Sequence, residues 1–150
     1  MTAARHMASP TTVDLANAKR ILRYLKKRPG LEIIYKRDSR FELTCFSDAS
    51  YAQAAGFKST TGSMVFLAGG LIHFNSQTQR ILAQSTSESE IIALNTTAKH
   101  GIYFSSMLGE LGWRQLRTFK LLTDNRSALS LASHGNFGAR SRHISVRYAA

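Results

Sequence analysis

The pattern of apolar positions predicts a helix near the start of the chain. Apolar residues recur at helical spacing from residue 15 onward, at Leu15, Ala18, Leu22 and Leu25. Thr11, with Asp14 three residues later, is typical of a capped helix start. Lysines and arginines occupy the remaining faces, and Pro29-Gly30 is expected to stop the helix. Residues 1–10 show no clear period.

Short apolar runs after this helix predict strands. The runs are residues 31–35, 41–47, 63–67, 71–75 and, much later, 119–123. Ala68-Gly69-Gly70 separates the third run from the fourth, and glycine supplies the positive φ that a tight hairpin requires. We therefore expect residues 63–75 to form a β-hairpin, whereas the run at 31–35 is only a short strand candidate.

Helical spacing returns in the second half of the chain. A long helix is predicted from about Ser87 to Leu111, ended by Gly112. Its buried stripe is predicted to consist of Ile91, Leu94, Ala98 and Ile102. Shorter helices are expected near 127–133 and over 140–148. Three antiparallel strands followed by helix, strand and helix predict an α/β fold, with one mixed sheet and helices on its faces.

Composition adds a strong positive charge to this picture. Twenty Lys and Arg against nine Asp and Glu give a net charge of +11 and a pI of about 10.4. Such a charge predicts an anionic partner, most often nucleic acid. No apolar run approaches the ~20 residues of a spanning helix, and no signal-peptide core opens the chain, so we expect neither membrane insertion nor secretion. The single cysteine, Cys45, is interpreted as a buried structural thiol.

Three acids stand out against the basic background. Asp48 and Asp124 each end a strand-like run, and Glu90 lies at the start of the long helix. Carboxylates are the ligands that hard divalent cations prefer, so these acids could converge on metal. The alternatives are a first-turn acid favoured by the helix dipole for Glu90, and an ordinary turn or N-cap residue for Asp124. Glu88 competes with Glu90 for the metal role.

Five segments in order resemble the ribonuclease H domain of copia-type LTR retrotransposon Pol polyproteins. They are Ser47–Ala52, Lys58–Ser63, Ser85–Leu94, Asp124–Leu129 and Arg140–Tyr148. Upstream, Ala18–Lys26 is similar to the helix that joins the reverse transcriptase to this domain. The resemblance implies a division into a basic helix with its connecting segment, residues 1–40, and a ribonuclease H-like domain, residues 41–150. It also implies a sheet in which the first strand neighbours the fourth.

The family's chemistry gives each acid a role. The resemblance implies that Asp48 bridges two Mg²⁺ ions and that Glu90 and Asp124 each hold one side, with Mn²⁺ as an alternative ion. The implied function is an endoribonuclease that degrades the RNA strand of RNA/DNA hybrids during reverse transcription. The implied partners are the hybrid and the reverse transcriptase domain of the same polyprotein, in a cytoplasmic retroelement particle or the nucleus.

Nucleic-acid contacts are expected from a further set of mainly basic residues. These are Lys58, Asn125, Arg140, Arg142, His143 and Arg147. The alternative for the cluster around His143 is a solvated basic helix face. A Ser-His-Asp site built from Ser47, His73 and Asp124 is supported by no motif.

The resemblance breaks at the end of the chain. The family continues into a last strand and a helix that carries a fourth metal-binding acid, and both are expected to be missing from a chain that ends at Ala150. Ser145 stands where the family usually has Asp, and Ser50 and Tyr51 replace Asp and Trp. The sequence therefore predicts a truncated copy with impaired activity. The rival hypothesis is a non-catalytic remnant that binds nucleic acid.

Overall fold

The computed structural model of the chain describes residues 6–37, 39–113, 118–126, 129 and 144–148, the last five by their backbone alone. The chain separates into two compact units, Met1–Ile34 and Tyr35–Ala150. The boundary between these units falls slightly before the division after residue 40 that the sequence suggests. Within the described residues, no helix is both long and apolar enough to cross a membrane.

The first unit is built around helix α1, Thr12–Lys26. The predicted capping box is present: the Asp14 carboxylate accepts from the Thr11 backbone N–H at 2.9 Å and from its hydroxyl at 2.6 Å. These Thr11 hydrogen bonds, with that of His6, lower the pKa of Asp14 to about 2. The strand candidate at residues 31–35 is wrong, because residues 31–36 have no regular structure and Leu31, Ile33 and Ile34 are exposed.

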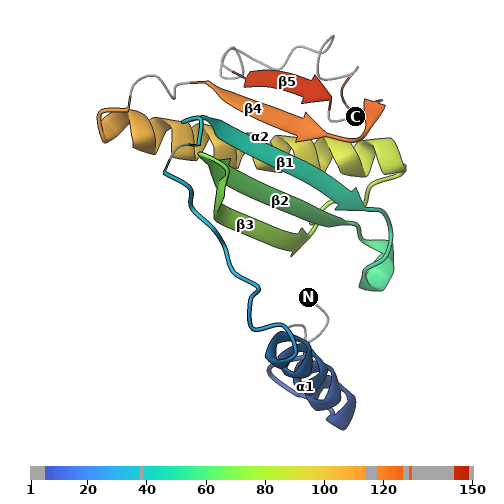
Figure 1. Ribbon diagram of the computed structural model, residues 1–150. Helices are drawn as coiled ribbons and strands as arrows, with labels where there is room; N and C mark the ends of the chain where they lie inside the picture. The colour runs from blue at the N-terminus through green and yellow to red at the C-terminus, as the bar shows by residue number, and fades with distance from the viewer. Residues whose placement is uncertain (1–5, 38, 114–117, 127–128, 130–143, 149–150) are drawn as a thin grey trace. The chain divides into compact units, whose positions relative to one another are not determined.

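The second unit is a mixed five-stranded sheet with helix α2, Thr86–Glu110, packed on one face (Figure 1). Its strands in chain order are β1 Leu43–Ser50, β2 Thr60–Leu67, β3 Gly70–Thr78, β4 Phe119–Thr123 and β5 Ile144–Tyr148. The spatial order is β3-β2-β1-β4-β5, in which β1 pairs antiparallel with β2 and parallel with β4. The mixed α/β architecture and the contact of the first strand with the fourth are thus confirmed.

The predicted hairpin joins β2 and β3. Ala68 and Gly69 both have positive φ, 50° and 76°. Two consecutive positive φ angles are the requirement of a type I′ turn, whose twist matches that of the strands. A second connection, between β1 and β2, contains the short 3₁₀ helix η2, Ala55–Phe57.

The end of the chain differs from the prediction. Residues 144–148 form β5, parallel to β4 with Phe119 paired to Ile144 and Thr123 paired to Tyr148. The expectations of a missing last strand and of a helix over residues 140–148 are therefore wrong in this segment. The reason is visible in the residues, since apolar and polar positions alternate from Ile144 to Tyr148 with the period of a strand. The helix expected near 127–133 lies for the most part outside the described residues.

The core lies between the sheet and α2. It consists of Leu43, Cys45, Val65, Leu94, Ala98, Leu108, Phe119 and Leu121. Cys45 is fully buried, and this burial raises the pKa of its thiol to about 12, as suits a structural rather than a nucleophilic cysteine.

The buried face of α2 differs in part from the predicted stripe. Leu94 and Ala98 are buried as expected, but Ile102 is 37% exposed. Small and polar residues occupy much of the buried face instead: Ser89, Thr97, Gly101 and Ser105. Apolar spacing alone therefore identified only part of the buried face, which includes Gly101 at a close approach to Phe119 of β4.

Gly101 marks this close approach and yields a prediction. A Cβ at this position would overlap the ring of Phe119, which is buried against the helix. We expect Gly101→Ala to lower the free energy of unfolding by about 1–3 kcal/mol, the usual cost of overpacking a core. Gly109→Ala is the matched control on the same helix, since a Cβ there meets nothing within 4 Å. It should be neutral or stabilising, and chemical denaturation of both variants measures the difference. Equal stabilities would show that the helix can move away from β4 freely.

Candidate active site: three acids at the ends of β1 and β4

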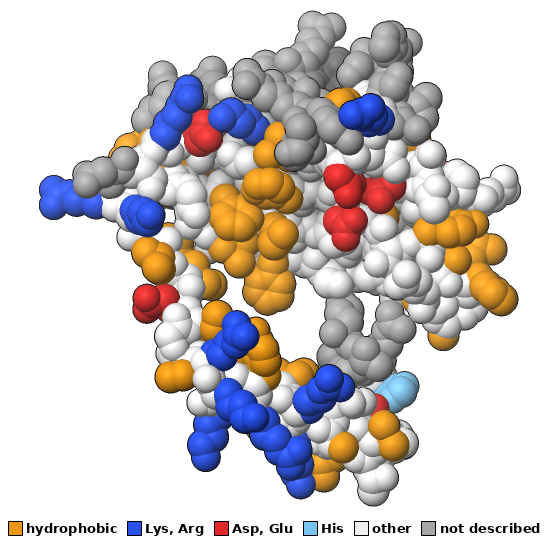
Figure 2. Space-filling view, turned by 45° about the vertical axis from the view of Figure 1, so that its right-hand side comes forward, with side chains coloured by type: hydrophobic (Ala, Val, Ile, Leu, Met, Phe, Trp, Pro, Cys, Tyr) orange, Lys and Arg blue, Asp and Glu red, His pale blue; other side chains and the backbone are white. Residues whose placement is uncertain are grey.

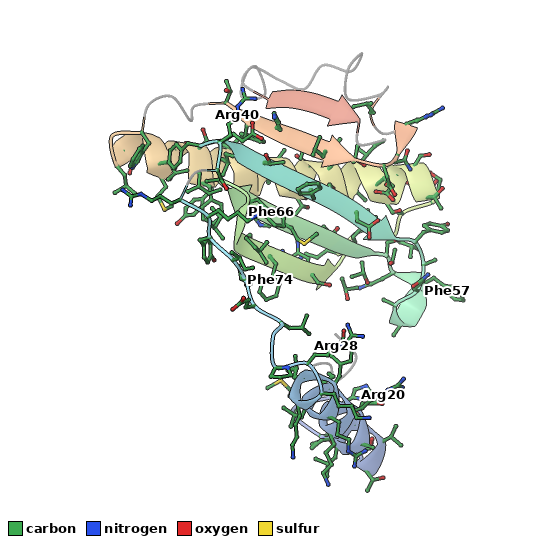
Figure 3. The ribbon with its side chains drawn as sticks, in the orientation of Figure 1. Arg20, Arg28, Arg40, Phe57, Phe66 and Phe74 are labelled. Carbon is green, nitrogen blue, oxygen red and sulfur yellow. The ribbon has the colours of Figure 1, made fainter. Side chains whose placement is uncertain are left out.

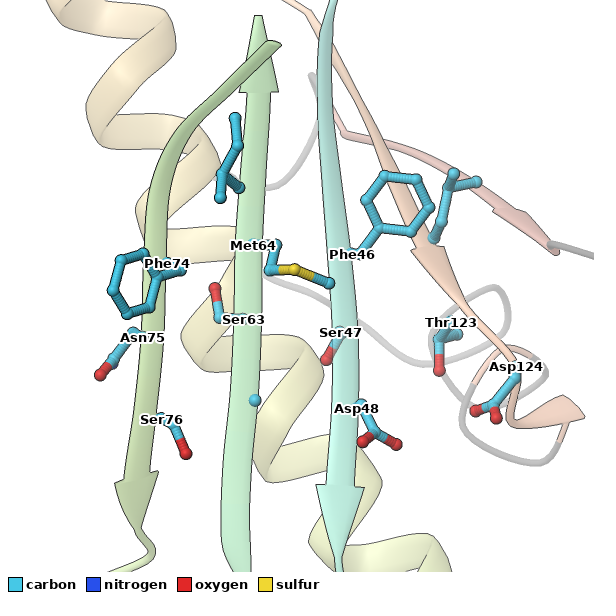
Figure 4. Close-up of a pocket in the computed structure, with 13 residues that line it drawn as sticks. Phe46, Ser47, Asp48, Ser63, Met64, Phe74, Asn75, Ser76, Thr123 and Asp124 are labelled. Atoms are coloured by element: carbon cyan, nitrogen blue, oxygen red, sulfur yellow. The ribbon is translucent and has the colours of Figure 1, made fainter. Parts of the chain in front are cut away.

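The sheet topology brings two of the predicted acids together. β1 and β4 are parallel neighbours, with Ser47 paired to Thr123. Asp48 and Asp124 each follow one of these paired residues, so both lie at the same edge of the sheet. In Figure 4 the two side chains project into the same space.

Helix α2 supplies the third acid. Glu90 lies in its first turns, and Ser85 caps the helix by accepting from the Glu88 N–H. The carboxylates of Asp48, Glu90 and Asp124 offer oxygen atoms that all lie within 4.8 Å of one another. Asp48 and Asp124 are exposed, whereas Glu90 is buried. Figure 2 shows acidic side chains gathered at one place on the surface, beside a hydrophobic area.

The carboxyl group of Glu90 is buried beside two other acids. Burial raises the pKa of its carboxyl to about 7, and the charges of Asp48 and Asp124 add to the increase. A hydrogen bond from the Ala49 backbone acts in the opposite direction. The Glu90 Oε2 atom is buried and has no hydrogen-bond partner within the described part of the chain. An all-carboxylate set with an unsatisfied oxygen fits a hard divalent cation such as Mg²⁺.

Glu88, the alternative ligand, is engaged elsewhere. Its Oε2 atom accepts from the Gln84 backbone N–H at 2.7 Å, so it helps to cap α2. It does not belong to the group of acids that could share a metal ion among the described residues. The geometry therefore favours Glu90 over Glu88.

A groove extends from the acids along the sheet face that lies away from α2. It has a volume of about 550 Å³. Asp48 and Asp124 lie at its polar end, and its apolar lining comes from Phe46, Met64, Leu71, Phe74 and Leu122. Residues of β1 alternate between the two faces, so Cys45 and Ser47 are buried while Phe46 and Asp48 are exposed. Phe74, which lines the groove, lies on β3, and Phe66 lies on β2 beside Phe46; Phe66 and Phe74 are labelled in Figure 3.

The predicted nucleic-acid contacts are described only in part. Lys58 is exposed, directly after η2. The Asn125 N–H donates to the Thr123 hydroxyl at 3.3 Å, beside the acids. The backbone of Arg147 pairs with Leu122 in the sheet. Arg140, Arg142 and His143 lie outside the described residues. The roles of all these residues in nucleic-acid binding stay predictions.

Two polar features were not predicted from the sequence. His73 packs against the rings of His100 and Phe104, and His100 hydrogen-bonds to Ser63 at 3.0 Å. This packing gives His73 a place between β3 and α2, and it lends no support to a Ser47-His73-Asp124 site. The other feature is Gln79, which lies in the polar run Ser76–Arg80 of the sequence and is almost completely buried.

Comparison with known proteins identifies related sequences. The retrovirus-related Pol polyprotein from transposon RE1 of Arabidopsis thaliana is 32% identical over 146 residues, which are 97% of this chain and 10% of the relative. The one from transposon TNT 1-94 of Nicotiana tabacum is 33% identical over 97% of this chain and 11% of the relative. The chain therefore spans about a tenth of the length of these relatives, and its predicted resemblance to them is confirmed.

Two further comparisons complete this result. No protein-family model matches the chain. Among solved structures, LC11-RNase H1 in complex with an RNA/DNA hybrid superimposes with a TM-score of 0.48 at 12% identity, over 72% of this chain and 85% of that one.

Proposed function

We propose that this chain, a relative of transposon Pol polyproteins, is a ribonuclease H-type hydrolase that degrades the RNA strand of RNA/DNA hybrids during reverse transcription of a retroelement. The observation that carries the proposal is the convergence of Asp48, Glu90 and Asp124. Sequence segments far apart in the chain supply these acids, and a β-β-β-α-β topology brings them to one edge of the sheet.

The three acids are suited to hold the ions of a metal-dependent nuclease. Mg²⁺, or Mn²⁺ in its place, would activate water and stabilise the leaving oxygen of a phosphodiester when bound there. Asp48 lies on β1, the central strand, which pairs with β4 and packs against α2, so we assign it the bridging position. The Ala49 backbone N–H donates a hydrogen bond to the Glu90 carboxylate. The buried Oε2 atom of Glu90 is then available to bind the cation.

Charge and homology support the partners. A net charge of +11 favours binding to a phosphate backbone, with Lys58 and the basic residues near the C-terminus as contacts. The longer relatives are Pol polyproteins, so we propose a reverse transcriptase domain of the same polyprotein as the second partner, in a cytoplasmic particle or the nucleus.

Cleavage of an end-labelled RNA/DNA hybrid tests the function. We expect the RNA strand to be cut in the presence of Mn²⁺ or Mg²⁺, with no cleavage in a chelator. Duplex DNA of the same sequence is the matched control and should stay intact. Binding of the hybrid without cleavage under either ion would contradict the enzyme and support the non-catalytic alternative.

A further inference from the structure

Gln79 connects the sheet to the start of α2, close to the three acids of the candidate site. It directly follows β3 and is 4% exposed. Its backbone N–H donates to the Ser59 carbonyl at 2.8 Å. Its side-chain Nε2 atom donates to the Thr61 hydroxyl at 3.0 Å and to the Ser89 carbonyl at 2.8 Å. One buried amide group thus joins strand β2 to the first turn of α2.

Two of the partners of Gln79, Ser89 and Thr61, lie close to the acids. Ser89 precedes Glu90 on the helix. Thr61 is paired across the sheet with Ala49, which follows Asp48 and whose backbone hydrogen-bonds to Glu90. Thr61 and Ser89 are themselves buried, so the hydrogen bonds that link them through Gln79 are shielded from water.

This link opposes the repulsion between the acids. Three carboxylates within 4.8 Å repel one another, and the force tends to separate the start of α2 from the sheet. Few large apolar contacts hold that turn, because its buried residues are Ser89 and Glu90. A directional contact at this place fixes the position of the turn more sharply than apolar packing would.

We propose that Gln79 is a positioning residue of the candidate active site, whose amide holds the first turn of α2 so that Glu90 meets Asp48 and Asp124. The proposal rests on the proposed function only in taking these acids as cation ligands. It assigns Gln79 no contact with substrate.

One atom of the Gln79 side chain has no hydrogen-bond partner among the described residues, and this makes it possible to test a positioning role apart from a contribution to stability. The Gln79 Oε1 atom is buried without a partner in the described part of the chain. A buried acceptor in that state costs about 1–3 kcal/mol, which offsets much of what the two Nε2 bonds contribute. A side chain of similar size without polar atoms removes this unpaired acceptor together with the link. It also takes the Gln79 donor away from the Thr61 hydroxyl and the Ser89 carbonyl, so we expect a modest net loss of stability.

Gln79→Leu is the variant that tests this proposal. We expect the Mn²⁺ dissociation constant, measured by titration calorimetry without nucleic acid, to rise roughly 10-fold or more, as for other residues that orient metal ligands. The melting temperature in chelator should fall only modestly. Gln79→Asn keeps the amide on a shorter side chain and should give an intermediate dissociation constant. It also serves if the leucine variant does not fold.

Thr97→Val is the matched control. It removes another buried hydrogen bond of α2, from the Thr97 hydroxyl to the Ala93 carbonyl, further along the helix. It should bind Mn²⁺ like the parent. Parent-like affinity in Gln79→Leu, or equal losses in both variants, would overturn the positioning role, and so would a parent that binds no Mn²⁺. A weakened Gln79→Leu beside a parent that binds Mn²⁺ but cleaves no hybrid would preserve the positioning role and reject the nuclease.

Discussion

Asp48→Asn is expected to abolish the Mg²⁺- or Mn²⁺-dependent cleavage of RNA/DNA hybrids and to leave the fold intact. Asp48 lies on the central strand, and its carboxylate faces both Glu90 and Asp124. Asparagine keeps the size of the side chain but removes the negative charge that a bridging ligand supplies. Bound metal ions stabilise the transition state by several kcal/mol, so the rate should fall roughly a thousandfold or more.

Although its cleavage rate falls, the Asp48→Asn variant should be as stable as the parent or slightly more stable. Removing one of three adjacent negative charges relieves repulsion, so the metal-free variant should melt at or slightly above the temperature of the parent. Glu88→Gln is the control, since it removes a nearby negative charge from the start of α2 without touching the cluster. We expect that control to retain cleavage. An Asp48→Asn protein that cleaves the hybrid at the parental rate would reject the bridging role and the nuclease with it.

The parts of the fold that were predicted correctly have strong local signals. Residues 119–123 form the predicted strand, because a compact apolar run is bounded by polar residues on both sides. Gly69 and Gly112 have the positive φ that a hairpin and a helix end require. The acids were predicted from their positions at strand ends and at a helix start, which the topology then brings together.

The errors arise where tertiary contacts outweigh local pattern. β5 has only five residues, and the basic residues around it resemble a solvated helix face until β4 offers it a partner. Ile102 was assigned to the buried stripe on spacing, but Gly101 is the residue that contacts β4 through Phe119. Gln79 shows no sequence signal at all, because its importance depends on two segments that only the folded chain brings to it.

A second large effect is expected from Glu90 in the metal-free protein. The folded-state pKa of Glu90 is about 7, raised by burial and by Asp48 and Asp124, against an ordinary value of 4.5. Between these two pH values the folded chain keeps a proton that the unfolded chain has released. Stability therefore falls as the pH rises through this window, by about 3 kcal/mol in total, and Glu90 causes no further loss above it.

Glu90→Gln should remove this pH dependence, because glutamine is neutral at every pH in the window. In chelator at pH 8 the variant should be more stable than the parent by up to about 3 kcal/mol, and near pH 4.5 the two should be similar. Urea denaturation at pH 5, 6, 7 and 8 measures the difference. Burial, with the neighbouring His73, lowers the pKa of His100 and acts in the opposite sense, but both proteins contain His100, so its contribution cancels.

Glu110→Gln provides the control, since Glu110 is exposed at the other end of the same helix. Its stability should depend on pH as the parent's does. Addition of Mn²⁺ at pH 8 should then stabilise the parent and the Glu110→Gln variant but not Glu90→Gln, because a bound cation stabilises the ionised carboxylate in the folded state. If the stabilities of the parent and Glu90→Gln changed with pH in parallel, the pKa of Glu90 would not be raised by burial beside its two acidic neighbours. If the parent and Glu90→Gln bound Mn²⁺ with equal affinity, Glu90 would not be a ligand of the metal.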